Sequence, residues 1–270
     1  MRVLKLARRT LAVLRAYVIS DLLRSRGLVY GLMGITLWIL LFTLPITLFT
    51  DPGIDRGVLS AQVFTGVMVF LFYSAATWDW AAEIRWMIND GRLEYYIASG
   101  SGFLPHYLGV LPVSLTWIAM ALTLAYLVLS LVFAPPVIVV KNWVLLLYGF
   151  TLLITTLLGY ALVLGGTILS SGASGGIMEL LGFILPVATG GLTPLVRLPR
   201  QVQVFALLTP FSYSAELVRH SLLGTPLVLS LEETCLYGGV YSIVFLALSV
   251  LYFKHQYRKL LREGVRLTAR

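Results

Sequence analysis

Six apolar runs, most of them 20 residues or longer, constrain this chain more than any other feature of its sequence. A helix needs about 20 apolar residues to cross a hydrocarbon layer roughly 30 Å thick. The runs are residues 29–49, 58–78, 107–133, 143–169, 177–196 and 235–253. With a mean hydropathy of +0.90 and only 12% charged residues, the chain is predicted to be an all-α integral membrane protein with six transmembrane helices rather than a soluble domain.

The basic residues gather at the two ends of the chain. Residues 1–27 contain seven Lys or Arg and residues 254–270 contain six, which together are 13 of the 20 in the sequence. Basic flanks stay on the cytoplasmic side of a membrane. We therefore expect both termini in the cytoplasm, an even number of crossings and a multi-pass protein of the cell membrane. This placement explains the pI near 9.7 without nucleic acid as a partner, and membrane lipids are the expected partners of the basic ends.

An amphipathic helix is predicted before the first run, which we interpret as an uncleaved span rather than a signal peptide. Apolar residues recur every three or four positions there, and basic residues lie opposite. The apolar stripe comprises Leu4, Ala7, Leu11, Leu14, Val18 and Leu22, and the basic face comprises Arg2, Lys5 and Arg9. Such a helix lies flat in the headgroup layer. The alternative is a basic tail that only sets the topology.

Residues 202–223 are long enough to cross a membrane but contain Pro210, Glu216, Arg219 and His220. Charges in a bilayer core are costly, and a seventh crossing would separate the termini. We therefore predict a pair of outer re-entrant or interfacial helices within residues 194–224. Glu216 and Arg219, three positions apart, are expected to pair on one helical face.

Residues 83–105 form a polar island between the second and third runs, on the predicted cytoplasmic side. The island carries charges, aromatic residues and a turn at Asp90-Gly91, which suggests contact with a cytosolic partner. The predicted organisation is therefore residues 1–27 as an interfacial helix, 28–254 as a transmembrane domain and 255–270 as a basic cytoplasmic tail.

The sequence lacks the Gly-rich Lys-Ser/Thr motif of a phosphate-binding loop, so the chain is not expected to hydrolyse ATP. The three histidines His106, His220 and His255 lie far apart and are expected at interfaces or in solvent rather than on zinc. No metal or cofactor is expected in this chain. The Gly-Ala-Ser-Gly sequence around Ser174 resembles that of rhomboid-type intramembrane serine proteases, but no histidine lies in the last apolar run to pair with this serine.

The ordered set of features resembles the permease subunit of ABC-2 type ATP-binding-cassette exporters over nearly the whole chain. The set comprises the interfacial helix, six spans, the polar island and the outer proline-marked segment. In the outer segment the matching residues are Pro194, Leu198-Pro199, Leu208-Thr209-Pro210, Tyr213 and Arg219, with Thr209 where the family often has asparagine. In the island, Gly91, Leu93 and Glu94 followed by Ile97 resemble the family's Gly-x-Leu-Glu pattern.

The resemblance implies a division of roles. Residues 92–98 would be a coupling helix that docks on a separate ATPase chain, where ATP and Mg²⁺ bind. The implied coupling residues are Asp90, Gly91, Arg92, Leu93, Glu94, Tyr95 and Ile97, and the implied outer gate consists of Pro194, Leu198, Pro199, Pro210, Tyr213, Glu216 and Arg219. A second permease chain, identical or different, would complete the path.

Two other functions remain open at this stage, an intramembrane serine protease using Ser174 and a membrane scaffold without transport. Aromatic residues in the first two runs, such as Trp38 and Phe70, either line a path or pack against lipid and neighbouring helices. The sequence does not specify the substrate, and a lipid or hydrophobic small molecule is the expectation.

Overall fold

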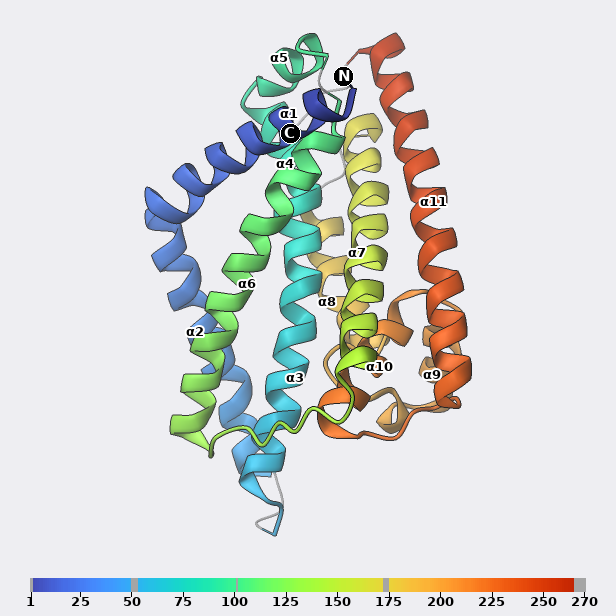
Figure 1. Ribbon diagram of the computed structural model, residues 1–270. Coiled ribbons are helices and arrows are strands. Elements are labelled where there is room, and N and C mark those ends of the chain that lie inside the picture. Colours follow the sequence, from blue (N-terminus) through green and yellow to red (C-terminus); the bar gives the residue numbers. More distant parts are fainter. Residues whose placement is uncertain (1, 50–52, 101, 172–174, 265–270) are drawn as a thin grey trace. The chain divides into compact units, whose positions relative to one another are not determined.

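A computed structural model describes residues 2–49, 53–100, 102–171 and 175–264 of the chain. The regular secondary structure in this part is helical, as predicted (Figure 1). The helices are α1 (Arg2–Tyr17), η1 (Val18–Leu23), α2 (Arg26–Phe49), α3 (Arg56–Ala75), η2 (Ala76–Ala81), α4 (Ala82–Asn89), α5 (Arg92–Ala98), α6 (Leu104–Val132), α7 (Trp143–Ser171), α8 (Gly175–Ala188), η3 (Leu195–Arg197), α9 (Arg200–Leu207), α10 (Phe211–Leu223) and α11 (Leu231–Glu263).

Four helices in the described residues are long and apolar enough to cross a membrane. They are the continuous helix Arg56–Asn89, made of α3, η2 and α4, together with α6, α7 and α11. Their length and composition are those of the helices of a membrane protein. The helix Arg56–Asn89 continues beyond the predicted end at residue 78, so the polar island begins inside a helix rather than in a loop.

The predicted span at residues 177–196 is shorter in the structure than in the sequence analysis. Helix α8 ends at Ala188 after 14 residues, a length of about 21 Å at 1.5 Å per residue. The chain then turns through Gly190, whose φ of +80° lies in the left-handed region that side-chain-bearing residues rarely adopt. Apolar content continues to Val196, but the backbone conformation at Gly190 ends the helix first.

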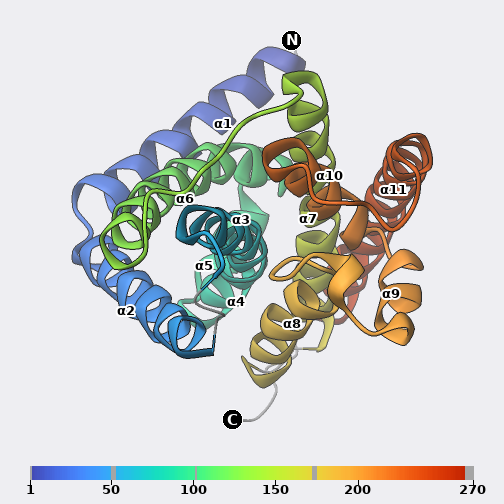
Figure 2. The ribbon, with the colours of Figure 1, turned by 90° about the horizontal axis from the view of Figure 1, so that it is seen from below.

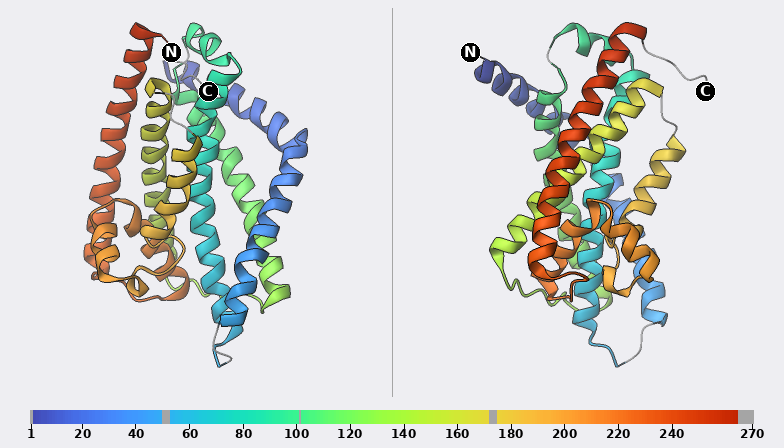
Figure 3. Two further views of the ribbon diagram at one scale, coloured as in Figure 1. Left: turned by 180° about the vertical axis from the view of Figure 1, so that it is seen from behind. Right: turned by 90° about the vertical axis from the view of Figure 1, so that its right-hand side faces the viewer.

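The chain divides into two compact units, residues 1–64 with 86–137, and residues 65–85 with 138–270. Each unit is described by itself. In the first, α1 packs across the beginning of α6, as Figure 3 shows. Gly109 permits this approach, because a Cβ atom there would lie only 2.7 Å from the Val13 side chain. Helix α2 also packs on α6, where Gly31 lies beside Trp117.

In the second unit, α7 and α11 lie side by side and run in the same direction (Figure 1). The Thr156 hydroxyl is 2.8 Å from that of Ser242, and the Thr167 hydroxyl is 3.1 Å from that of Tyr252. These bonded pairs are 86 and 85 residues apart, and such a constant separation requires parallel helices. The chain between α7 and α11 therefore returns to the end of the unit at which α7 began.

Candidate functional site

The predicted turn at Asp90-Gly91 joins α4 to the short helix α5. Gly91 has a φ of +67°, a left-handed conformation that glycine adopts without steric cost. The Arg92 guanidinium lies 2.8 Å from the Asp90 carboxylate in an ion pair that is about half exposed. Exposed pairs of this kind contribute less than about 1 kcal/mol, so the glycine rather than the ion pair fixes the turn.

Helix α5 covers residues Arg92–Ala98, the same residues as the expected coupling helix. Leu93 is only 1% exposed and packs into its own chain, and Ile97 is half-buried. Tyr95 is 81% exposed, and Arg92 and Glu94 are exposed beside it. The surface that α5 offers to a partner therefore consists of Arg92, Glu94 and Tyr95, whereas the buried Leu93 side chain holds the helix against the rest of the chain.

The chain around α5 is bonded to α1 and α6 within the first unit. Arg9 of α1 donates a hydrogen bond of 3.1 Å to the Gly100 carbonyl oxygen, just after α5. The Tyr96 hydroxyl donates to the Gly102 carbonyl oxygen at 3.0 Å. The His106 ring, at the start of α6, lies 6.1 Å from the Tyr96 ring and 5.7 Å from the Tyr17 ring. Three helices thus meet around one imidazole.

The expected exposure of His106 is wrong. The side chain is 1% exposed, and its Nε2 has no hydrogen-bond partner. Helix α1 covers this position, an arrangement that the spacing of histidines along the sequence does not reveal. His106 is therefore a packing residue between α1, α5 and α6 rather than an interfacial side chain.

The segment predicted to lie on the outer side, residues 194–224, contains two short helices rather than one long helix. Helices α9 and α10 have eight and 13 residues and are separated by Leu208-Thr209-Pro210. Proline has no N–H to continue a helical ladder. The Tyr213 hydroxyl donates 2.6 Å to the Leu207 carbonyl oxygen and so ties the two helices together. Neither helix is long enough to span a bilayer, and the re-entrant or interfacial position of the pair stays a prediction.

The first part of the outer segment is a chain of short turns. Pro194 precedes η3 and Pro199 precedes α9, both with extended ψ angles, of 133° and 146°. The Leu198 carbonyl oxygen accepts a hydrogen bond of 2.8 Å from the Gln203 amide. These prolines therefore position a folded connection rather than continue α8.

Helix α10 is almost completely buried in the second unit, beside α7 (Figure 2). Gly149 of α7 allows this contact, because a Cβ atom there would lie 3.1 Å from Val218. The Phe211 ring packs among the rings of Tyr73, Tyr160 and Phe245, with centroids 6.1, 5.9 and 5.5 Å away. Helix α10 is thus covered by protein, so its charged side chains are surrounded by other residues of the chain.

Glu216 and Arg219 are 4% and 1% exposed. Glu216 accepts a hydrogen bond of 3.0 Å from the backbone N–H of Leu195 and another from that of Val228. Arg219 donates to the Gly191 carbonyl oxygen. The two opposite charges attract each other, but the hydrogen bonds of these side chains go to backbone groups of the surrounding turns.

Burial sets the ionisation of both groups. It raises the pKa of the Glu216 carboxyl above its usual value, because the ionised form loses water. It lowers the pKa of the Arg219 guanidinium to about 10, so this group stays charged at neutral pH. The hydrogen bonds of Glu216 and Arg219 connect helix α10 to the turn after α8, to η3 and to the segment before α11.

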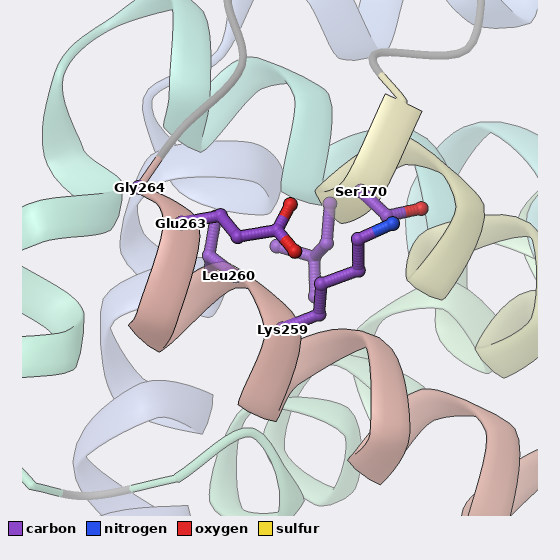
Figure 4. Close-up of a pocket in the computed structure, with 6 residues that line it drawn as sticks. Ser170, Lys259, Leu260, Glu263 and Gly264 are labelled. Atoms are coloured by element: carbon purple, nitrogen blue, oxygen red, sulfur yellow. The ribbon is translucent and has the colours of Figure 1, made fainter.

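The described residues offer a depression and no metal-binding cluster of acidic, histidine or cysteine side chains among the features that bear on chemistry. No group of three His, Cys, Asp or Glu side chains is placed there to hold a metal ion. A depression of about 160 Å³ lies at the ends of α7 and α11, where Lys259 extends towards Ser170 (Figure 4). It is smaller than typical small-molecule sites, which begin at about 300 Å³. Ser174, the serine of the protease hypothesis, lies outside the described residues.

Neither a protein-family model nor a curated protein matches this sequence. The function is therefore argued from the residues and the geometry.

The sequence pattern did not identify Arg9 and His106 as neighbours of α5, or Gly191 as a partner of Arg219. Arg9 was assigned to the basic face of the N-terminal helix from its position alone. No spacing in the sequence indicates these contacts, because each joins segments that are distant along the chain.

Proposed function

We propose that this chain is the permease subunit of an ATP-binding-cassette exporter, a membrane path driven by a separate ATPase chain. The observation that carries the proposal is α5, a short helix set off by a left-handed glycine between two candidate spans, Arg56–Asn89 and α6. It presents Arg92, Glu94 and Tyr95 outward while Leu93 anchors it. A seated helix with an exposed polar and aromatic face suits transmission of a partner's movement to the spans that flank it.

The parallel course of α7 and α11 supports the proposed topology of six crossings. Because α7 and α11 run in the same direction, the chain between them must come back to the side on which α7 begins. In this proposal α8 and the connection that follows it make that return. The pair α9 and α10 then adds no crossing, and the ends of α7 and α11 lie on the same side as both termini. In this proposal α2 and α8 complete the six spans, and that side is the cytoplasm.

The outer gate of the proposal is the segment 194–224. Helix α10 holds its turns through Glu216 and Arg219, and Tyr213 joins α10 to α9. A segment bonded in this way moves as one piece, which is the property that a gate requires. Pro194, Leu198, Pro199 and Pro210 set its bends.

The energy source lies outside this chain in the proposal. ATP and Mg²⁺ bind to two partner ATPase subunits, and a second permease chain completes the substrate path. Nucleotide binding favours one packing of the spans over another only through its different affinity for the two states. A lipid or a hydrophobic small molecule is the proposed cargo class.

The first experiment identifies the partner and then tests the contact. The tagged chain is purified in mild detergent, and an ATP-binding-cassette ATPase is expected in the complex by mass spectrometry. Glu94→Arg is expected to reduce recovery of this ATPase at least about tenfold, equivalent to about 1.4 kcal/mol.

Glu232→Arg is the matched control, because Glu232 is also exposed but lies at the start of α11, on the outer side in the proposed topology. It is expected to leave ATPase recovery unchanged. Recovery that is equal for Glu94→Arg and the unchanged chain would refute the coupling role of α5, and absence of any such ATPase would refute the exporter.

A further inference from the structure

Helix α1 has three distinct faces within the first unit. The face towards α6 includes Val13, which contacts Gly109, and Tyr17, which contacts His106. Next to it lies an apolar face in which Leu4 is 60% and Leu11 is 64% exposed. The remaining face is basic and exposed, with Lys5, Arg8, Arg9 and Arg15.

The exposed faces of α1 have the chemistry of a membrane surface ligand. Residues 2–17 contain no Asp or Glu, so the basic face has no acidic neighbour on its own helix. Exposed leucines beside a row of cations match acyl chains beside anionic headgroups. Protein packing already uses the third face, so the leucines remain available to lipid while the helix stays bound to α6.

We propose that α1 binds an anionic phospholipid surface and that this binding restrains α5. Lys5, Arg8 and Arg15 contact the headgroups, and Leu4 and Leu11 enter the acyl region. The restraint passes through Arg9, which bonds to Gly100 directly after α5.

A second contact carries the restraint in parallel. The Tyr17 ring of α1 lies against His106, and the same imidazole lies against Tyr96 of α5. The buried imidazole thus touches both helices. Fixing α1 on a charged surface therefore limits the motion of α5 relative to α6. The lipid-binding step rests only on the membrane character of the chain, and the consequence for transport rests on the proposed function.

The test follows α5 directly and needs no ATPase. Cys235 is the single cysteine of the chain, so a Cys235→Ser background carrying Tyr95→Cys gives one spin label on α5. The full chain is placed in nanodiscs of phosphatidylcholine alone or with about 30% phosphatidylglycerol, an anionic lipid. We expect the rotational correlation time of the label to rise at least about twofold with the anionic lipid, and the rise to shrink in high salt.

Two sets of variants assign the response. Joint replacement of Lys5, Arg8 and Arg15 by Gln is expected to abolish the lipid dependence. Arg9→Gln is expected to weaken it at residue 95 while a label at Ala12→Cys on α1 still responds to the anionic lipid. These positions are exposed, so the substitutions leave the packed core unchanged.

Three results would overturn the inference. They are equal label mobility in the two lipids, a lipid response that survives the triple replacement, and the same response when free inorganic phosphate is added to phosphatidylcholine discs. The last would show that a soluble anion is the ligand. A negative result here leaves the Glu94 experiment unaffected, and loss of the ATPase partner leaves this lipid response unaffected.

Discussion

Replacement of Glu216 by Ala tests whether the carboxyl group of α10 holds the outer segment together. In the structure this group accepts hydrogen bonds from the backbone N–H groups of Leu195 and Val228. Alanine would leave two donors without an acceptor, the buried N–H of Leu195 and the N–H of the half-buried Val228, at about 1–3 kcal/mol each. The expected loss in free energy of unfolding is therefore about 2–6 kcal/mol.

The assay is thermal unfolding of the purified chain in detergent, followed by tryptophan fluorescence. For a chain of this size about 1 kcal/mol shifts the Tm by roughly 2–4 °C, so Glu216→Ala is expected to lower it by at least about 4 °C. Glu216→Gln keeps a side-chain oxygen as acceptor, and we expect a smaller fall.

Glu232→Ala is the control, since the same atoms are removed from an exposed residue in the first turn of α11. Its cost is limited to a helix-dipole contribution of less than about 1 kcal/mol. A Tm for Glu216→Ala within about 2 °C of that control would refute the reasoning, because the two N–H groups would then have found other partners.

Three further predictions use the same measurement. Gly66→Ala is expected to reduce the free energy of unfolding by about 1–3 kcal/mol through overpacking, and so to give a lower Tm than Gly182→Ala. A Cβ atom at Gly66 would lie 2.7 Å from the Leu192 carbonyl oxygen, whereas one at Gly182 meets nothing closer than 3.6 Å. Equal Tm values for the two variants would contradict that packing. Ser230→Ala removes the capping box of α11 and is expected to cost about 1 kcal/mol; an unchanged Tm would contradict the stabilising role of this cap. Burial raises the folded-state pKa of Glu216, so protonation of this carboxyl adds stability below the unfolded pKa, and that stability is lost as the pH rises through the raised folded pKa. The Tm advantage of the unchanged chain over Glu216→Gln should therefore fall as the pH rises above the ordinary pKa of a Glu side chain, and an advantage that grows with pH would show a lowered pKa instead.

Local features of the structure follow from the sequence. The Asp90-Gly91 turn and the break at Thr209-Pro210 depend on the backbone preferences of a few adjacent residues, and both are present. The four long apolar helices follow from hydropathy, because a run of about 20 apolar residues is typical of a membrane-spanning helix.

Features that depend on distant segments could not be read in this way. Glu216 and Arg219 bond to backbone groups 21 and 28 residues away, although their spacing suggested mainly a pair with each other. His106 is buried by α1, and no periodicity in either segment shows which helix covers it. Gly190-Gly191 is a local indication that α8 ends early. The apolar residues that continue through Val196 nevertheless predict a longer span.

The parallel contact between α7 and α11 has a consequence for how the protein is made. The ribosome delivers α7 first, while Ser242 and Tyr252, which bond to Thr156 and Thr167, belong to α11 and are translated 86 and 85 residues later than their partners. The flank of α7 that carries these hydroxyl groups therefore lacks its α11 partners until α11 has been made. A nascent chain that stops before α11 exposes the hydroxyl groups of that flank, a feature by which membrane quality control can distinguish an unfinished product from a complete one.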